Sequence, residues 1–315
     1  MKTNEIGVAG EVRCVVTKAD GTVKVDTGYH KNLILNQGLD FFGGGKGGAI
    51  NAYCAIGAGN STPLITQTKL DSYISQAYGT DTTSNYSYVD TGDGLYRMWE
   101  QKKYRFTPSS DINVSELGLV STGTTSSNYY LTTRTLLKDS LGVPTTITVR
   151  IGETLDIYYK FHKVIDTTDK SFVINVLDGD GGAIPYNVVV RPLGVGNNRN
   201  NVSVPTTYYN YLTVDTSDLM PITTSTSSGS AMAGKFNFSS YSVGAFKNTA
   251  SFSFTLDEAN MGIRRLDSYS AEYSGTFPFQ MRFGRVSDDA PLTKTNKDIL
   301  SIPLEFSWGR FEGVL

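Results

Sequence analysis

Histidines and carboxylates are the residues with which this chain could do acid–base chemistry or bind a metal, and it has only two histidines. His30 and His162 are far apart in the sequence, and neither belongs to an HExxH pattern. His162 closes a run of alternating apolar and polar residues, so we expect a hydrogen-bonded residue at the edge of a strand and not a base. The two histidines and the scattered carboxylates therefore predict no metal site.

Two pairs of neighbouring carboxylates are the next candidates. Asp257-Glu258 or Asp178/Asp180 could serve glycoside hydrolysis, which requires two carboxyl groups at a defined separation. The second pair also resembles the start of a calcium loop, but Val189 occupies the place of the required glutamate. We interpret that segment as a β-turn. The sequence thus predicts no catalytic, cofactor-binding or metal-binding residues, and we expect a protein that is not an enzyme.

A glycine pair and a basic cluster complete the candidates. Gly57-x-Gly59 has neither the third glycine of a dinucleotide loop nor a following Gly-Lys-Ser/Thr, so it predicts a structural turn. Lys102, Lys103 and Arg105 stand beside aromatic residues, a combination that can bind nucleic acid or glycan but is typical of a solvated strand face. The net charge of −2 gives no electrostatic reason to expect nucleic-acid binding.

Strands are the elements that would position these residues. Charged residues make up only 18% of the chain, which suits sheets with hydroxyl-rich outer faces. The clearest pattern is in residues 112–161, where segments 143–151 and 155–161 alternate with period two across a glycine-containing turn. With the runs at 112–120 and 129–138, they predict a four-stranded antiparallel meander.

The whole chain is expected to be all-β, built from antiparallel meanders or sandwiches. At 315 residues it is long enough for two β-rich domains, which we place at residues 1–165 and 166–315. Apolar residues at helical spacing predict one short helix near residues 32–42, and residues 257–261 allow a single helical turn. Residues 72–91 are polar and rich in tyrosine, and we interpret them as an irregular excursion.

Targeting signals and cysteines indicate the compartment. No run of about 18 apolar residues predicts a membrane span. The N-terminus lacks the features of a signal peptide, so we expect synthesis and folding in a cytoplasm. The two cysteines, Cys14 and Cys54, lie in apolar strand-like segments and are expected to be buried free thiols.

Several linked motifs resemble a known group of proteins. They are NLILNQGL at 32–39, AIGAGNSTP at 55–63, ELGL at 116–119, RTLLKD at 134–139, GETLDIYY at 152–159 and FSWGR at 306–310. This order resembles a group of bacteriophage virion proteins of the tail, tail fibre or appendage. The match covers the first half of the chain well and the second half thinly.

The resemblance implies a non-enzymatic structural component of the tail, baseplate or an appendage, located in the virion after synthesis in the bacterial host cytoplasm. Exposed strand edges must be covered, so we expect partnership with itself as a homo-oligomer and with other virion proteins. The alternative is a receptor- or glycan-binding module that contacts a host-surface glycan, with nineteen tyrosines as stacking surfaces. A depolymerising glycosidase is the third hypothesis.

Two further expectations concern individual side chains. Glu116 and Arg134 interrupt apolar or threonine-rich runs, and they either face one another across neighbouring strands or both point to solvent. Leu304, Phe306 and Trp308 share one parity near the C-terminus. A strand here would bury three large side chains, so we expect it to dock on the second half of the chain or on a neighbouring subunit.

Overall fold

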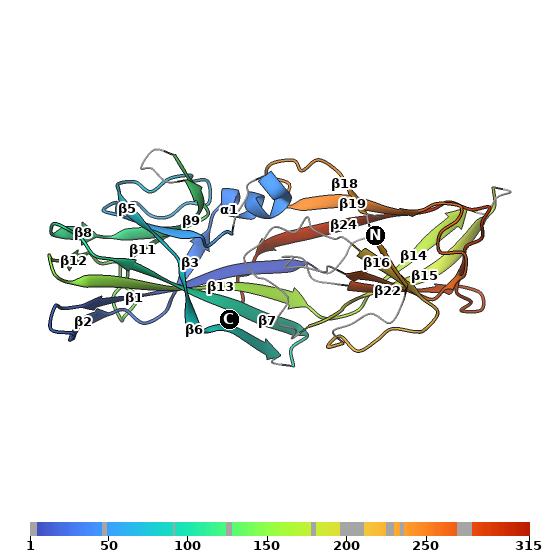
Figure 1. The fold of residues 1–315 in the computed structure, drawn as a ribbon, viewed down its shortest axis with the longest axis horizontal. Helices are drawn as coiled ribbons and strands as arrows, with labels where there is room; N and C mark the ends of the chain where they lie inside the picture. The colour runs from blue at the N-terminus through green and yellow to red at the C-terminus, as the bar shows by residue number, and fades with distance from the viewer. Residues whose placement is uncertain are drawn as a thin grey trace.

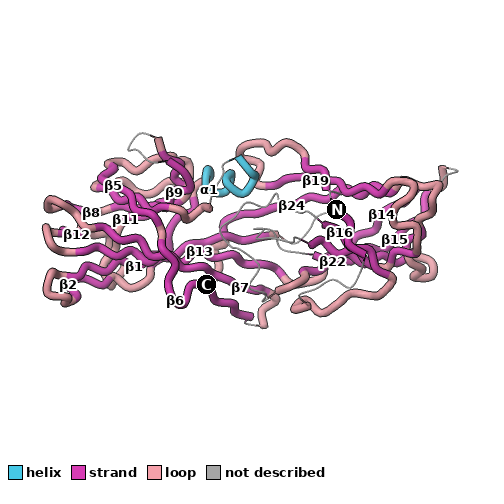
Figure 2. The backbone as a smooth tube through the Cα atoms, in the orientation of Figure 1, coloured by secondary structure: helices cyan, strands magenta, loops and turns pink. Residues whose placement is uncertain are grey.

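The computed structural model describes residues 5–45, 49–90, 92–123, 128–177, 181–195, 211–224, 230–233, 236–269 and 279–315. Strands hold 55% of the residues and helix 3%, which confirms the all-β class and its mostly antiparallel sheets. The molecule is elongated, with β8 (Ile112–Val114) and β12 (Ile147–Val149) at one end and β14 (Lys170–Leu177) and β15 (Ala183–Pro192) at the other (Figure 1). Strands run through both ends, and the short helical segment lies near the middle (Figure 2).

The first half is organised around β1 (Ile6–Thr17), whose residues alternate between buried and partly exposed from Val12 onward. Along one edge it pairs over its full length with β13 (Thr154–Asp166). Along the other edge it meets β24 (Leu300–Arg310), β3 (His30–Ile34) and β2 (Val23–Asp26) in turn. A strand paired on both edges has no exposed ladder, so β1 is the centre of this sheet.

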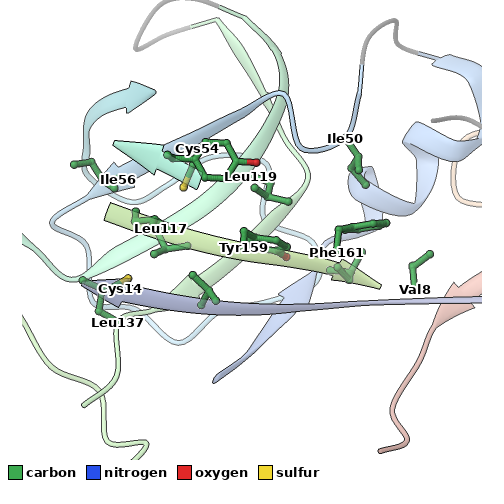
Figure 3. Close-up of a cluster of buried hydrophobic side chains, with 14 of the residues drawn as sticks. Val8, Cys14, Ile50, Cys54, Ile56, Leu117, Leu119, Leu137, Tyr159 and Phe161 are labelled. Atoms are coloured by element: carbon green, nitrogen blue, oxygen red, sulfur yellow. The ribbon is translucent and has the colours of Figure 1, made fainter. Parts of the chain in front are cut away.

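The sheet continues in both directions from β1 and encloses an apolar core. Its other members in the first half are β4 (Tyr53–Gly57), β5 (Tyr73–Tyr78), β6 (Thr80–Asp90), β7 (Leu95–Phe106), β9 (Glu116–Gly123), β10 (Tyr129–Leu131) and β11 (Thr133–Leu136). Through β24 the sheet also includes β19 (Lys247–Phe254) and β18 (Phe236–Phe238). In Figure 3, Cys54 of β4 and Leu119 of β9 lie across this core from Tyr159 and Phe161 of β13. Cys14 and Cys54 are buried free thiols, as predicted.

The four-stranded meander predicted for residues 112–161 is wrong in its pairing. The strands form, but β12 pairs with β8, β11 pairs with β9 and β3, and β13 pairs with β1 and β7. The turn at Gly152 is present, with a positive φ of 82°. However, the strand before the turn is only three residues long, and Val143 and Ile151, expected on its buried face, are exposed. The thirteen-residue β13 instead matches the apolar stripes of the twelve-residue strands β1 and β7.

Three local predictions also differ from the structure or refine it. The helix near residues 32–42 exists as α1 (Asn36–Asp40) continued by the π-helical turn η1 (Phe41–Gly45), but the residues before it belong to β3. Residues 72–91 are not irregular, because they contain β5 and β6. Tyrosine and threonine favour strands even where few aliphatic residues mark the pattern. Residues 257–261 form a turn without a helix.

The second half contains a six-stranded sheet in the order β14-β15-β22-β21-β16-β17. The additional strands of this half are β16 (Tyr211–Asp215), β17 (Ser230–Ala233), β18 (Phe236–Phe238), β19 (Lys247–Phe254), β20 (Gly262–Ile263), β21 (Arg265–Tyr269), β22 (Phe279–Arg285) and β23 (Leu292–Thr293). Residues of β15, β16 and β22 share an apolar cluster with residues of β19 and β24. The β19–β24 pair therefore covers one face of the six-stranded sheet.

The last strand belongs to both halves. β24 pairs antiparallel with β19 and, at its end, parallel with β1. Leu304 and Phe306 are buried in the core of the second half, whereas Trp308 is buried in the core of the first. The predicted C-terminal strand is confirmed, and it docks on the chain itself. The proposed division at residue 165 remains a prediction, since β24 joins the two cores.

Candidate functional site

Glu116 and Arg134 face one another inside the first half, so the alternative in which both point to solvent is wrong. Arg134 Nε donates to Glu116 Oε2 at 2.8 Å, and neither side chain has any exposed surface. The carboxylate also accepts the backbone N–H groups of Gly59, Asp71 and Ser72 at 3.0, 3.2 and 2.8 Å. Its charge is therefore compensated from two sides.

The Gly57-x-Gly59 turn is structural, as predicted, and it binds an anion that the chain itself supplies. A Cβ added at Gly57 would lie 2.6 Å from Glu116 Oε1, so a side chain there would displace the carboxylate. The Arg134 guanidinium donates to the Ser61 carbonyl at 3.1 Å and to Gln67 Oε1 at 2.8 Å. This network fixes the segment between β4 and β5, with the Glu116 carboxylate beside Gly57 and Gly59.

The remaining candidates from the sequence do not assemble into a site. His30 Nε2 pairs with the Thr27 carbonyl oxygen at 2.6 Å. Glu258 accepts the N–H of Thr255 at 2.9 Å and so closes a turn. Asp178 and Asp180 lie outside the described residues. Within the described ranges, no three His, Cys, Asp or Glu residues are grouped as metal ligands would be.

Charged and aromatic side chains that are far apart in the sequence lie side by side on the outer face of β1, β13 and β7. The strand register places these residues in rows across the sheet: Arg13–Tyr158–Lys103, Glu11–Lys160–Gln101 and Ala9–His162–Trp99. His162 is not at a sheet edge, because β13 continues beyond it and is paired on both sides. It is almost fully buried, with Nε2 3.0 Å from Glu11 Oε2.

Cations and aromatic rings alternate along this outer face. The Lys160 ammonium lies 4.1 Å from the ring centroid of Tyr29 and 4.8 Å from that of Trp99. Farther along, Tyr158 lies between Arg13 and Lys103, at 5.7 and 5.5 Å from its ring. Such cation–π contacts stabilise positive charge without a carboxylate and hold the long side chains in place.

The basic cluster of β7 is divided between the two faces of the strand. Lys102 points away from Lys103 and Arg105, and its ammonium lies 3.8 Å from Glu100. Arg105 makes a bidentate pair with Asp156 at 2.7 Å, and Lys103 contacts the same carboxylate at 2.9 Å. The predicted solvated face is wrong for Lys102, because period-two alternation places it on the inner side of the strand.

A pocket of about 450 Å³ opens at one end of the outer face. Its lining consists of Glu11, Asp93, Arg97, Trp99, Lys160, His162, Val314 and Leu315. Arg97 pairs with Asp93 through two hydrogen bonds of 3.1 and 2.7 Å, and its Nε donates to the Val314 carbonyl at 3.0 Å. The volume and the mixture of an aromatic ring with converging polar groups are those of a small-molecule site.

The electrostatics of this pocket favour binding over glycoside hydrolysis. The hydrogen bond from His162 lowers the pKa of Glu11, against the opposing effect of burial. A general acid in glycoside hydrolysis needs a raised pKa. Glu11 is thus suited to accept hydrogen bonds and not to protonate a leaving group.

A second hollow, of about 470 Å³ beside α1, has a different character. Its buried Asp40 accepts hydrogen bonds from the Tyr241 hydroxyl at 2.6 Å and from the Gly244 N–H at 2.7 Å. Tyr130 donates to the Gln37 carbonyl at 2.7 Å. These groups join α1 to the loop before β19, so we assign them to the joint between the two halves.

Lys163 is the buried titratable group with the clearest consequence for stability. Its side chain is on the inner face of β13, near the Phe42 ring, and burial lowers its pKa to about 7 against the opposing effect of Glu100. The unfolded chain, with a lysine pKa of about 10.4, binds more protons between these two values, so stability should rise with pH there.

We expect this gain to disappear when Lys163 is replaced by methionine. From about pH 7 to about pH 9, wild type should gain roughly 1 kcal/mol per pH unit relative to Lys163→Met, measured by urea unfolding. The exposed Lys247→Met is the matched control and should run parallel to wild type. Parallel curves for wild type and Lys163→Met would show that Lys163 is charged in the folded protein.

Comparisons with known proteins found no match for this chain: no protein-family model matches the sequence, and no curated protein or solved structure matches it either. In the described part of the chain, no helix is both long and apolar enough to cross a membrane.

Proposed function

We propose that the chain is a non-enzymatic structural component of a bacteriophage particle, in the tail, baseplate or an appendage, and that it assembles as a homo-oligomer. The observation that carries this proposal is the edge strand β14. It ends the six-stranded sheet and pairs with β15 alone among the described strands. Such an edge presents unpaired N–H and C=O groups along its whole length.

The sequence of β14 lacks the features that usually protect an edge. Residues 171–177 contain no charge and no proline, and the strand is eight residues long. Val173 and Leu177 are 64% and 75% exposed on its outward face. A second copy of the chain, added strand to strand, would cover both the backbone edge and these apolar side chains. The motif resemblance to virion proteins supports the particle as the place of assembly.

The assembly is tested by light scattering on the purified protein. Wild type should be a homo-oligomer, and the double change Val173→Lys/Leu177→Lys should give a folded monomer, because like charges would meet across the paired edges. Leu141→Lys is the control, since Leu141 is even more exposed, at 86%, but lies in a turn of the other half. A monomeric wild type, or a double variant that still assembles, would overturn this mode of assembly.

Membership of a particle is tested separately by mass spectrometry of purified virions. The chain should be present at a copy number that is a multiple of the oligomer found in solution. Its absence from particles made in cells that express it would refute the structural assignment.

The second candidate is a receptor- or glycan-binding module of the same particle. The pocket on the outer face favours it, because a partly exposed tryptophan beside hydrogen-bond donors and acceptors is a typical sugar-binding arrangement. A depolymerising glycosidase is less well supported, since the pKa of Glu11 is lowered. Release of reducing sugar by the purified protein would decide for the enzyme.

A further inference from the structure

We infer that the pocket lined by Trp99, Lys160 and Glu11 binds an uncharged saccharide. This inference rests on the glycan-binding candidate and gives it a location and a ligand class. It does not depend on β14 or on assembly, so an experiment can refute saccharide binding without refuting assembly, and the reverse.

Lys160 is the donor side of the site. Within the described residues its ammonium has neither an ion-pair nor a hydrogen-bond partner, and the rings of Tyr29 and Trp99 hold it in place. Neighbouring cations differ: Arg13 binds Asp26 and Arg97 binds Asp93. An ammonium group has three donors, so Lys160 can hydrogen-bond to oxygens of a molecule in the pocket.

Glu11 is the acceptor side. His162 contacts its Oε2, whereas Oε1 has no hydrogen-bond partner in the described part of the chain. The lowered pKa keeps this group ionised, with free lone pairs that face the pocket. Glu11 and Lys160 are direct cross-strand neighbours, so an acceptor and a donor stand side by side. Adjacent sugar hydroxyls, each of which can donate and accept, match this pair.

Trp99 supplies the apolar part of the site. It neighbours His162 across the strands and is partly exposed, with its indole forming one wall of the pocket. An aromatic ring offers a flat surface to the C–H face of a pyranose.

Charge balance selects an uncharged ligand. Arg97 and Lys160 are offset by Glu11 and Asp93 in the same lining. An anion placed on Lys160 would lie beside the Glu11 carboxylate, and a cation placed on Glu11 would lie beside the ammonium. Hydroxyl groups interact favourably with both.

The experiment begins with the full chain on a glycan array containing neutral and acidic bacterial-surface saccharides, followed by fluorescence titration with the best ligand. Trp99 and Trp308 are the only tryptophans, and Trp308 is buried. Bound saccharide should therefore protect Trp99 from acrylamide quenching. We expect neutral saccharides to bind and Trp99→Ala and Lys160→Gln each to weaken binding by at least about tenfold.

Arg105→Gln is the matched control and should bind saccharide like wild type, because Arg105 lies on β7 with Trp99 but outside the pocket. Lys160→Gln alters only a partly exposed side chain, so it remains informative if Trp99→Ala does not fold. Binding confined to acidic glycans would overturn the uncharged-ligand inference. No binding to any glycan, or equal affinity of Lys160→Gln and wild type, would overturn the site.

Discussion

Replacing Glu116 by alanine is expected to lower the free energy of unfolding by about 3–5 kcal/mol, the usual result of removing one partner from a buried ion pair. The change removes the fully buried carboxylate that pairs with the buried Arg134 guanidinium, which then keeps the partly exposed Asp71 as its charged partner. It also removes the acceptor for three backbone N–H groups between β4 and β5. Buried donors without partners retain their full desolvation cost.

Urea unfolding of Glu116→Ala and wild type measures this loss. The control is Lys247→Ala, which removes an exposed pair with Glu305 of the same 2.8 Å length and should cost less than about 1 kcal/mol. Gly57→Ala should also destabilise the protein, because its Cβ would approach both Ser72 O and Glu116 Oε1. If Glu116→Ala unfolds at the same urea concentration as wild type, the buried network makes no net contribution to the free energy of unfolding.

The parts of this fold that the sequence predicts are those that neighbouring residues decide. The alternation of Leu155, Ile157, Tyr159 and Phe161 depends only on one buried face, and all four are buried as expected. The choice of pairing partner depends on the whole chain. β13 could only be assigned to β1, about 150 positions earlier, by comparing the two apolar stripes over their full length.

The sequence did not predict the candidate site, because the site too depends on which distant strands pair with one another. Glu11, Trp99 and Lys160 come from three strands that are distant in the chain and adjacent in the sheet. One signal was present: Arg97, Trp99 and Gln101 share a parity, as do Tyr158, Lys160 and His162. These two faces predict a sheet surface that carries polar and aromatic side chains. Only the register of β13 with β1 and β7 shows that they form one pocket.

Trp308 is expected to be the most sensitive position of the C-terminal strand. Its side chain is buried in the core of the first half, its ring stacks on Tyr241 with centroids 5.8 Å apart, and its Nε1 donates to the Leu39 carbonyl at 2.7 Å. Trp308→Ala should therefore cost about 3–5 kcal/mol through the cavity and the unpaired carbonyl. Trp308→Phe retains most of the ring and should lose distinctly less.

Removal of residues 306–315 should have a still larger effect, because this segment completes both halves. Phe306 leaves the second core and Trp308 leaves the first, while β1 loses all its pairing with β24 and β19 loses its pairing with Phe306 and Ser307. Each half would then expose apolar surface, and β1 would also expose an open strand edge, so we expect aggregation or loss of assembly. The measurement is solubility, melting and light scattering of the truncated chain beside Trp308→Phe. A truncated chain that stays soluble, melts at the wild-type temperature and still assembles would show that β24 does not join the two cores energetically, whatever its position between them.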